Sequence, residues 1–237
     1  MIGVAWARKR KHWIGAVAAG AGLVVLVAFA ARDYIGARYY EDYYAARGNV
    51  RSIQSGLPEL EELLLRAVRF APRRAYLEAL GSLYLDAALA ETQYGSPEKR
   101  DALLDKARDV LLTEIGKFPA AAYGYYNLGR VYMLYNHPLL TYAARGREYF
   151  RKALALQPAD EFMNVNALTL FLGQWALLDG GEKEDAWRRL EGALGRNEGF
   201  LRRIRDIWKR TYGNLDGLRA IYAKNPALGP RLEAFAR

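Results

Sequence analysis

An uninterrupted apolar run near the N-terminus, residues 13–31, constrains the fold of this chain more than any other feature of its sequence. The run contains no charged residue, and a basic cluster at 8–11 precedes it. As an α-helix it would span about 28 Å, close to the ~30 Å hydrocarbon thickness of a bilayer. We therefore expect one transmembrane helix, 13–31, anchored by Trp13, Leu23, Val24, Leu26 and Phe29.

The basic cluster also predicts the orientation of this helix. Because Lys and Arg are retained on the cytoplasmic side, we expect a cytoplasmic tail, 1–12, and an exported remainder. In a bacterium this is a single pass through the inner membrane, with the rest of the chain in the periplasm. A cleaved signal peptide is the alternative, since Ala28-Phe29-Ala30 fits the small-x-small cleavage pattern. Both alternatives export the rest of the chain.

The composition favours an all-α protein over a β-sandwich or barrel. Apolar residues make up 52% of the chain, prolines number 8, and no long linker rich in Ser, Gly or Pro is present. The chain has no cysteine, which excludes disulfides and thiolate metal sites. Outside the N-terminal cluster the excess of positive charge is spread along the chain. No basic stripe with interleaved aromatics stands out, so we expect no nucleic-acid partner.

Three later segments share one spacing of residues. In each, steps of four and three residues join mostly apolar or small side chains, and a proline follows five residues on. These steps keep the side chains on one helix face, and the proline ends the helix. A fourth, degenerate segment lacks the proline. The sets are Leu60/Leu64/Ala67/Pro72, Ala107/Leu111/Glu114/Pro119, Gly146/Phe150/Ala153/Pro158 and Ala186/Leu190/Ala193.

A Leu-Gly pair recurs between these segments, at Leu80-Gly81, Leu128-Gly129 and Leu172-Gly173, each time inside a helical pattern. Glycine costs a helix interior about 1 kcal/mol relative to alanine. Its repetition in one context therefore predicts close packing, with two helix backbones meeting at the glycine. In two copies a tyrosine follows three residues later, at Tyr84 and Tyr132.

This ordered set, Leu-Gly-x-x-Tyr and then the spacing that ends in proline, resembles the tetratricopeptide repeat over roughly residues 57–197. The resemblance implies an all-α solenoid of helical hairpins stacked into a right-handed superhelix. A juxtamembrane Tyr-rich helix, 32–56, would precede it, and capping helices, 198–237, would follow. The prolines lie 47 and 39 residues apart instead of about 34. We therefore expect longer loops at 88–100 and 136–140.

The resemblance also implies binding, because the first helix of each tetratricopeptide pair lines a concave groove. Tyr and Arg are favoured contact residues, since they combine a large rigid area with hydrogen bonding. We therefore expect a protein partner in the groove; the alternative is that some of these tyrosines pack inside the solenoid. The groove residues expected from the three copies are Tyr123, Tyr126, Arg130, Met133, Glu78, Ser82 and Gln174.

Two further segments are dense in one kind of residue. The tyrosine-dense segment 37–49 would continue the anchor and pack against the first half-repeat, with a dedicated partner contact as the alternative. The segment 200–212 places basic side chains away from an apolar face. This pattern is typical of a solenoid cap with a solvated basic face, or alternatively of contact with anionic lipid or an acidic partner. The basic side chains are Arg202, Arg203, Arg205, Lys209 and Arg210.

No motif in the sequence predicts catalysis. The chain has two histidines, His12 and His137, and neither a phosphate loop nor a nucleophile motif. We expect no enzyme activity, no cofactor and no metal site. The sequence favours a membrane-anchored scaffold, or an accessory or assembly subunit of an inner-membrane or envelope complex. An accessory role in cell-surface polysaccharide synthesis or export is the alternative.

Overall fold

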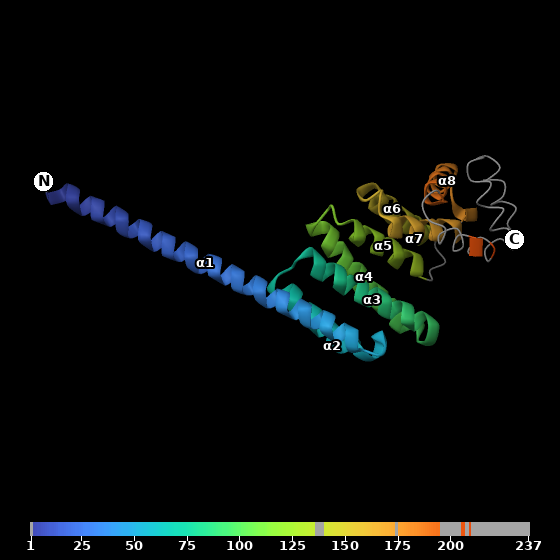
Figure 1. Ribbon diagram of the computed structural model, residues 1–237, viewed down its shortest axis with the longest axis horizontal. Helices are drawn as coiled ribbons and strands as arrows, with labels where there is room; N and C mark the ends of the chain where they lie inside the picture. The colour runs from blue at the N-terminus through green and yellow to red at the C-terminus, as the bar shows by residue number, and fades with distance from the viewer. Residues whose placement is uncertain (1, 136–139, 174, 195–204, 207–208, 210–237) are drawn as a thin grey trace. The chain divides into compact units, whose positions relative to one another are not determined.

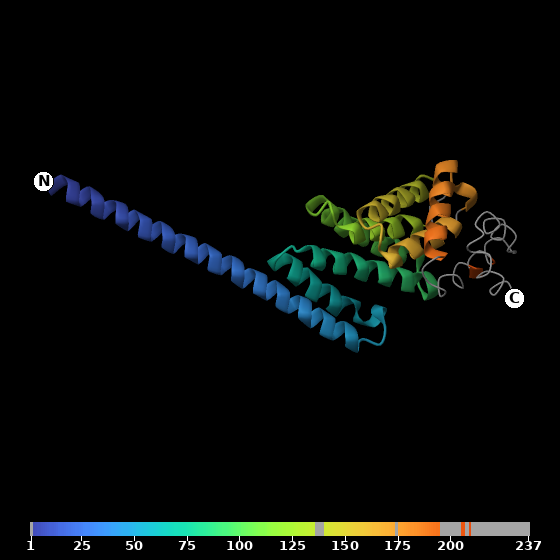
Figure 2. The same ribbon diagram turned by 45° about the horizontal axis from the view of Figure 1, so that its top comes forward.

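The structure, a computed structural model, describes residues 2–135, 140–173, 175–194, 205–206 and 209. These residues form α-helices and one short 3-10 helix, and no β-strand is found among them, as the sequence predicts. The chain divides into two compact units, Met1–Pro119 (unit 1) and Ala120–Arg237 (unit 2). The elements in Figures 1 and 2 are α1 (Ile2–Asn49), α2 (Ile53–Phe70), α3 (Arg74–Tyr94), α4 (Pro97–Lys117), α5 (Ala122–Leu134), α6 (Leu140–Leu156), α7 (Glu161–Gly173), η1 (Trp175–Leu177) and α8 (Gly180–Leu194).

Helix α1 joins the apolar run to the tyrosine-dense segment without a break, which confirms the predicted continuity (Figure 1). Its 48 residues span about 72 Å. By length and composition this helix is able to cross a membrane. The side chain of Trp13 lies outside the described ones. The other predicted anchor side chains, Leu23, Val24, Leu26 and Phe29, are 63–68% exposed.

The C-terminal part of α1 packs against α2 as an antiparallel hairpin. The ring of Tyr39 stacks on that of Phe70, with centroids 5.8 Å apart. The ring of Tyr40 lies 4.6 Å from that of Tyr76 at the start of α3, and Tyr43 is buried. These contacts confirm that the tyrosine-dense segment packs against the helices that follow it, α2 and the start of α3.

Helix α1 ends at Asn49, seven residues before the boundary expected at residue 56. Glycine and asparagine are weak helix formers, and the next helix begins with its own cap. The Ser52 hydroxyl accepts a hydrogen bond from the backbone N of Ser55 at 3.2 Å. The turn is closely packed, since a Cβ on Gly56 would lie 2.3 Å from Val50 Cγ1.

Helices α3 and α4 form a second antiparallel hairpin. The longer loop expected at 88–100 is wrong, because α3 continues to Tyr94 and α4 begins at Pro97. The additional residues lengthen both helices to 21 residues each. The break is short because Ser96 caps α4 by accepting a hydrogen bond from the backbone N of Lys99. Most of the other expected loop, 136–139, lies outside the described residues.

The helix ends before the repeated prolines are confirmed. Proline lacks the N–H that would continue the hydrogen-bond ladder, and it disfavours the α conformation of the preceding residue. In all three cases the helix ends two residues before the proline. The pairs are Phe70 and Pro72, Lys117 and Pro119, and Leu156 and Pro158.

The residues at the repeated spacing lie on the packed face of their helices, which confirms the face that the sequence predicts. Where the structure describes their side chains, they are at most 1% exposed or are buried glycine. Glu114 belongs to this face, although the equivalent positions in α2 and α6 carry alanine. The buried members are Leu60, Leu64, Ala67, Ala107, Leu111, Glu114, Gly146, Phe150, Ala153 and Ala186.

The predicted close packing is confirmed at Gly81 and Gly129, but of these two glycines Gly129 alone has the partner backbone among its nearest atoms. A Cβ on Gly81 of α3 would lie 2.6 Å from Leu111 Cδ2 of α4. A Cβ on Gly129 of α5 would lie 2.9 Å from Phe150 Cδ1 and 3.0 Å from the carbonyl oxygen of Gly146, both in α6. The surroundings of Gly173 lie outside the described side chains.

In unit 2, α5 and α6 form a hairpin, and a buried ion pair links α6 to α8. Arg147 Nε donates to Glu182 Oε1 at 3.0 Å, and Arg151 Nη2 lies 3.4 Å from the same oxygen. Glu182 also begins α8 with a reciprocal cap. Its backbone N donates to Asp179 Oδ1, and its carboxylate accepts from the backbone N of Asp179.

Candidate binding surface

Four of the predicted groove residues lie on one face of α5, because steps of three and four residues share a helix face. The face begins at Tyr123, which is half-buried and whose hydroxyl hydrogen-bonds Asp160 Oδ2 at 2.9 Å. Asp160 precedes α7 and caps it by accepting from the backbone N of Met163 at 2.8 Å. The contact thus fixes the start of α7 against α5.

Tyr126 is packed beneath this face of α5 and is not accessible to solvent or to a partner. Its side chain is 3% exposed. Its ring packs against Phe150 of α6 and Phe162 of α7, with centroids 5.7 Å and 6.0 Å away. The alternative that some tyrosines pack inside the fold therefore describes this residue.

Arg130 and Met133 continue the face and are half-buried. The guanidinium of Arg130 lies 5.8 Å from the centre of the Tyr126 ring, and its Nη1 donates to Asn127 Oδ1 at 3.3 Å. Both contacts hold the cation over the ring of the packed tyrosine. Met133 lies at the contact with α6, where its Cγ would be 2.9 Å from a Cβ on Gly146.

Sequence reasoning missed two residues of this surface. Phe162 is 58% exposed although it is a large apolar side chain at the first turn of α7. Asp160 is the hydrogen-bond partner of Tyr123 from 37 positions away. The sequence offers one signal for Asp160, an Asx residue just before a helix, which predicts a cap. No local pattern connects either residue to α5.

In unit 1 the predicted groove residues Glu78 and Ser82 lie one turn apart on α3, and both are half-buried. Burial raises the pKa of the Glu78 carboxyl, and Arg74 opposes the shift from 3.9 Å away. Glu114 of α4 is fully buried, and neither carboxyl oxygen has a hydrogen-bond partner. Burial and the charge of Glu78 raise the pKa of Glu114 to about 8, against the effect of Arg74.

A bridge between three helices lies near the middle of the α3–α4 hairpin. Glu61 Oε1 of α2 accepts from the Tyr84 hydroxyl of α3 at 2.7 Å and from Lys106 Nζ of α4 at 2.8 Å. Burial alone would raise the pKa of Glu61, but these hydrogen bonds lower it below its ordinary value. The bridge links α2, α3 and α4 through one carboxylate oxygen.

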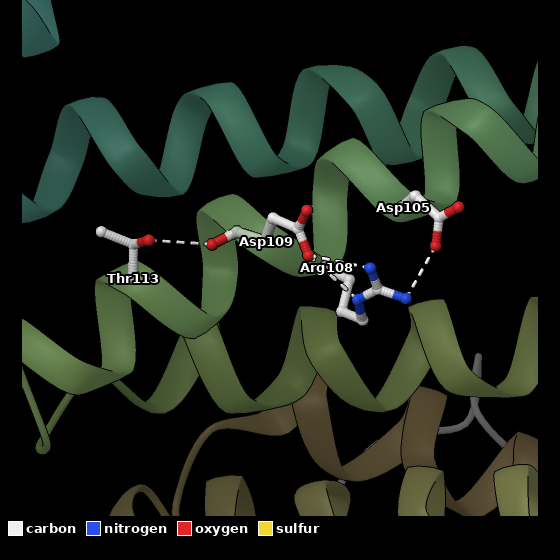
Figure 3. Close-up of polar contacts among 4 residues, drawn as sticks. All are labelled: Asp105, Arg108, Asp109 and Thr113. Carbon is white, nitrogen blue, oxygen red and sulfur yellow. Dashed lines mark hydrogen bonds and ion pairs between the residues drawn. The ribbon is translucent and has the colours of Figure 1, made fainter.

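The outward polar groups of α4 bind one another within the helix (Figure 3). Arg108 pairs with Asp105 at 2.7 Å and with Asp109 at 2.9 Å, and the Thr113 hydroxyl donates to the backbone oxygen of Asp109. The pair with Asp105 joins residues three apart and the Thr113 bond joins residues four apart, spacings that bring side chains together on one side of a helix. We assign them no role in binding.

Most of the remaining predicted site residues lie outside the residues that the structure describes. Within the predicted basic face, Arg205 pairs with Asp206 at 3.2 Å and Lys209 is exposed. The other members, together with Gln174 and His137, lie outside the described residues. They are Arg202, Arg203 and Arg210.

Within the described part of the chain, no group of three or more His, Cys, Asp or Glu side chains could hold a metal ion. Comparisons of the chain with protein-family models and with curated proteins give no match.

Proposed function

We propose that this protein is a membrane-anchored, all-α scaffold that binds a protein partner on the periplasmic side of a bacterial inner membrane. The observation that carries the proposal is the continuity of α1 (Figure 1). Its apolar part has exposed side chains that only a lipid or protein environment would cover. Its C-terminal part is the first helix of a packed hairpin. The same helix therefore supplies an anchor and a structural element of the scaffold.

Washing membranes with alkaline carbonate tests the anchor. We expect the full chain to stay in the membrane pellet, because a spanning helix is not released by loss of electrostatic contacts. The intact mass of the protein from membranes distinguishes the anchor from a cleaved signal peptide, which would remove the residues up to Ala30. Protease added to spheroplasts should digest both units, and protection of the units would contradict the periplasmic orientation.

The tetratricopeptide-like solenoid is the second part of the proposal. It is supported by the helix ends before Pro72, Pro119 and Pro158 and by the close contacts at Gly81 and Gly129. Hairpins of this kind bury their apolar face only by stacking on neighbours. Scattering of the full chain in detergent would test it, since an extended solenoid and a compact bundle differ in radius of gyration.

The face of α5 with the start of α7 is the surface we propose for the partner. It combines the half-buried Tyr123 and Arg130 with the exposed ring of Phe162. Buried or half-buried aromatics with an arginine are typical of the central contacts of protein interfaces. An accessible segment of a partner, extended or helical, would cover Phe162 and accept hydrogen bonds from Arg130.

Crosslinking in cells tests this surface. In the variant Arg130→Ala/Phe162→Ala we expect loss of the main crosslinked partner, because each side chain supplies accessible contact area. Leu156→Ala, which removes an apolar side chain that is 39% exposed at the end of α6, is the matched control and should keep the partner. An unchanged partner in the double variant would show that another surface binds. Tyr126→Ala is unsuitable, since it empties a packed position.

A further inference from the structure

The turn between α2 and α3 lies at the height of the lipid headgroups if α1 spans the bilayer. The apolar run ends at residue 31, so Asp33 and Gly36 lie about 3 Å and 8 Å further along the helix axis. The headgroup layer on each side of the hydrocarbon is about 5–8 Å thick. Tyr34, at the same height, is 73% exposed, and exposed tyrosines are enriched at membrane interfaces.

Two contacts fix the turn at this height. Arg73, just before α3, pairs with Asp33 of α1 through Nη2 and Oδ2 at 2.7 Å. A Cβ on Gly36 would lie 3.2 Å from the Cβ of Ala71, so α1 and the end of α2 are in close contact there. Figures 1 and 2 both show the α2–α3 connection beside α1, at the end of the hairpins toward the N-terminal half of that helix.

The end of unit 1 that carries this turn is positively charged. Arg32 and Arg69 are exposed, and the structure gives them no ion pair with any described residue. Arg73 and Arg74 are more than half exposed although each has an acidic neighbour. Lys117, exposed at the end of α4, belongs to the same end of the hairpins, because the nearby Glu114 interacts electrostatically with Arg74.

We propose that this cationic end of unit 1, at the α2–α3 turn, binds the phosphate groups of anionic lipids. The inference rests on the proposed membrane anchor and adds a second contact between the protein and its membrane. Exposed guanidinium groups bind phosphate oxygens with two parallel hydrogen bonds, and clustered basic side chains beside a spanning helix attract anionic lipids. The contact would hold unit 1 against the bilayer surface.

The absence of cysteine allows one fluorophore to report on lipid at a chosen site of the full chain. Ala75→Cys places a bimane on the first turn of α3, and Thr92→Cys places it on the last turn, about 25 Å away. Both residues are exposed. Each labelled protein is put into two kinds of phosphatidylcholine nanodisc. One kind contains phosphatidylglycerol with a nitroxide on its acyl chain near the headgroup, and the other contains the same fraction of phosphatidylcholine with the same nitroxide. A nitroxide quenches only at short range.

We expect phosphatidylglycerol to quench the Ala75→Cys fluorophore at least twofold more than phosphatidylcholine does, and the Thr92→Cys fluorophore to be quenched by neither. Adding Arg69→Glu/Lys117→Glu should remove the excess, whereas Arg51→Glu, an exposed arginine at the opposite end of the hairpins, should keep it. High salt should weaken the excess through screening.

Equal quenching of the Ala75→Cys fluorophore by the two lipids would overturn the proposal. So would an undiminished excess in the Arg69→Glu/Lys117→Glu protein whose circular dichroism matches that of the unchanged chain. Absence of the chain from the nanodiscs would overturn the anchor itself, and this outcome is read separately from the quenching. Inorganic phosphate added to nanodiscs of phosphatidylcholine alone should leave the fluorescence unchanged.

Discussion

Two glycines that face each other set the distance between α5 and α6. A Cβ on either would lie 3.0 Å from the carbonyl oxygen of the other, so Gly129 and Gly146 let the two backbones meet. A larger residue at Gly129 would also meet the ring of Phe150, which is fully buried. We expect Gly129→Leu to lower the free energy of unfolding by about 1–3 kcal/mol through overpacking.

Thermal unfolding of the full chain in a mild detergent, followed by circular dichroism, measures this effect. Gly116→Ala is the control, because Gly116 lies in α4 with no atom within 4 Å of an added Cβ. It should be neutral or slightly stabilising, since alanine is the better helix former. A Gly129→Leu protein that melts with the unchanged chain would count against the close contact.

Glu114 should make the protein less stable as the pH rises. Burial and the charge of Glu78 raise its pKa from 4.5 to about 8, with Arg74 opposing. The native state therefore binds the proton more tightly than the unfolded chain does. The free energy of unfolding should fall as the pH rises from about 4.5 to about 8 and then level off.

Replacing Glu114 by glutamine should remove this slope, because the amide stays neutral. The two proteins should be closest in stability near pH 4.5 and furthest apart near pH 8, with Glu114→Gln the more stable. Urea unfolding at several pH values gives the comparison. Glu98→Gln on the same helix is the control. The hydrogen bond from Ser96 lowers the pKa of Glu98. Titration of Glu98 therefore changes the stability at pH values below 4.5. A parallel slope in Glu114→Gln would contradict the assignment.

At the scale of whole elements, α8 depends on the buried pair between Arg147 and Glu182, whose side chains are 10% and 5% exposed. Removing the cation leaves a buried carboxylate with Arg151 as its remaining basic partner. We expect Arg147→Met to destabilise unit 2 by about 3 kcal/mol, at the low end for a broken buried pair. Adding Glu182→Gln should restore much of the loss, since the amide needs no counter-charge.

Melting curves of the single and double variants test this coupling. Arg38→Met is the control, because the pairs that the structure gives Arg38 with Glu41 and Asp42 lie at the exposed surface of α1. Exposed pairs contribute about 0–1 kcal/mol. If Arg147→Met and Arg38→Met were equally stable, the buried pair would contribute no more to stability than an exposed pair does.

The sequence predicted the end of the second helix of each hairpin well and the loop between α3 and α4 poorly. Proline and the buried steps of four and three residues act locally, so the ends at Phe70, Lys117 and Leu156 follow from the sequence itself. The expected loop at 88–100 came from comparing proline spacings with a standard repeat. Its residues are mostly good helix formers, and they extend the helices up to Gly95.

The candidate surface was less predictable because its contacts join distant segments. The steps of three and four residues predict which side chains share a face of α5. They do not distinguish a side chain that lines a groove from one that is packed inside the fold. Tyr126 became a packed residue because Phe150 and Phe162 close over it. Tyr123 was fixed by Asp160 across another helix. Both outcomes depend on where α6 and α7 lie, which no local pattern gives.

At the scale of the whole molecule, the two roles of α1 should separate at residue 31. A chain that lacks residues 1–31 should be soluble without detergent and melt at the temperature of the full chain, because the α1–α2 hairpin stays complete. A chain that lacks residues 1–49 also loses the packing of Tyr40 and Tyr43 and the 2.9 Å pair of Arg47 with Asp86. Its melting temperature should fall by at least about 5 °C.

Circular dichroism melts of the three chains test this division. A fall in the first truncated chain would mean that the apolar part of α1 also supports the fold. No fall in the second would mean that the tyrosine contacts contribute little.

If α1 spans the bilayer as proposed, its unbroken course also couples the rotation of unit 1 about the helix axis to the bilayer. A flexible linker would let the hairpins turn freely, but a helix transmits rotation about its own axis. One alanine inserted between Ala31 and Arg32 would turn unit 1 by about 100° and move it by about 1.5 Å. Four inserted residues would bring unit 1 back to about 40° from its original angle and about 6 Å further from the membrane. The face that unit 1 turns toward a neighbour in the membrane is therefore set by a residue count.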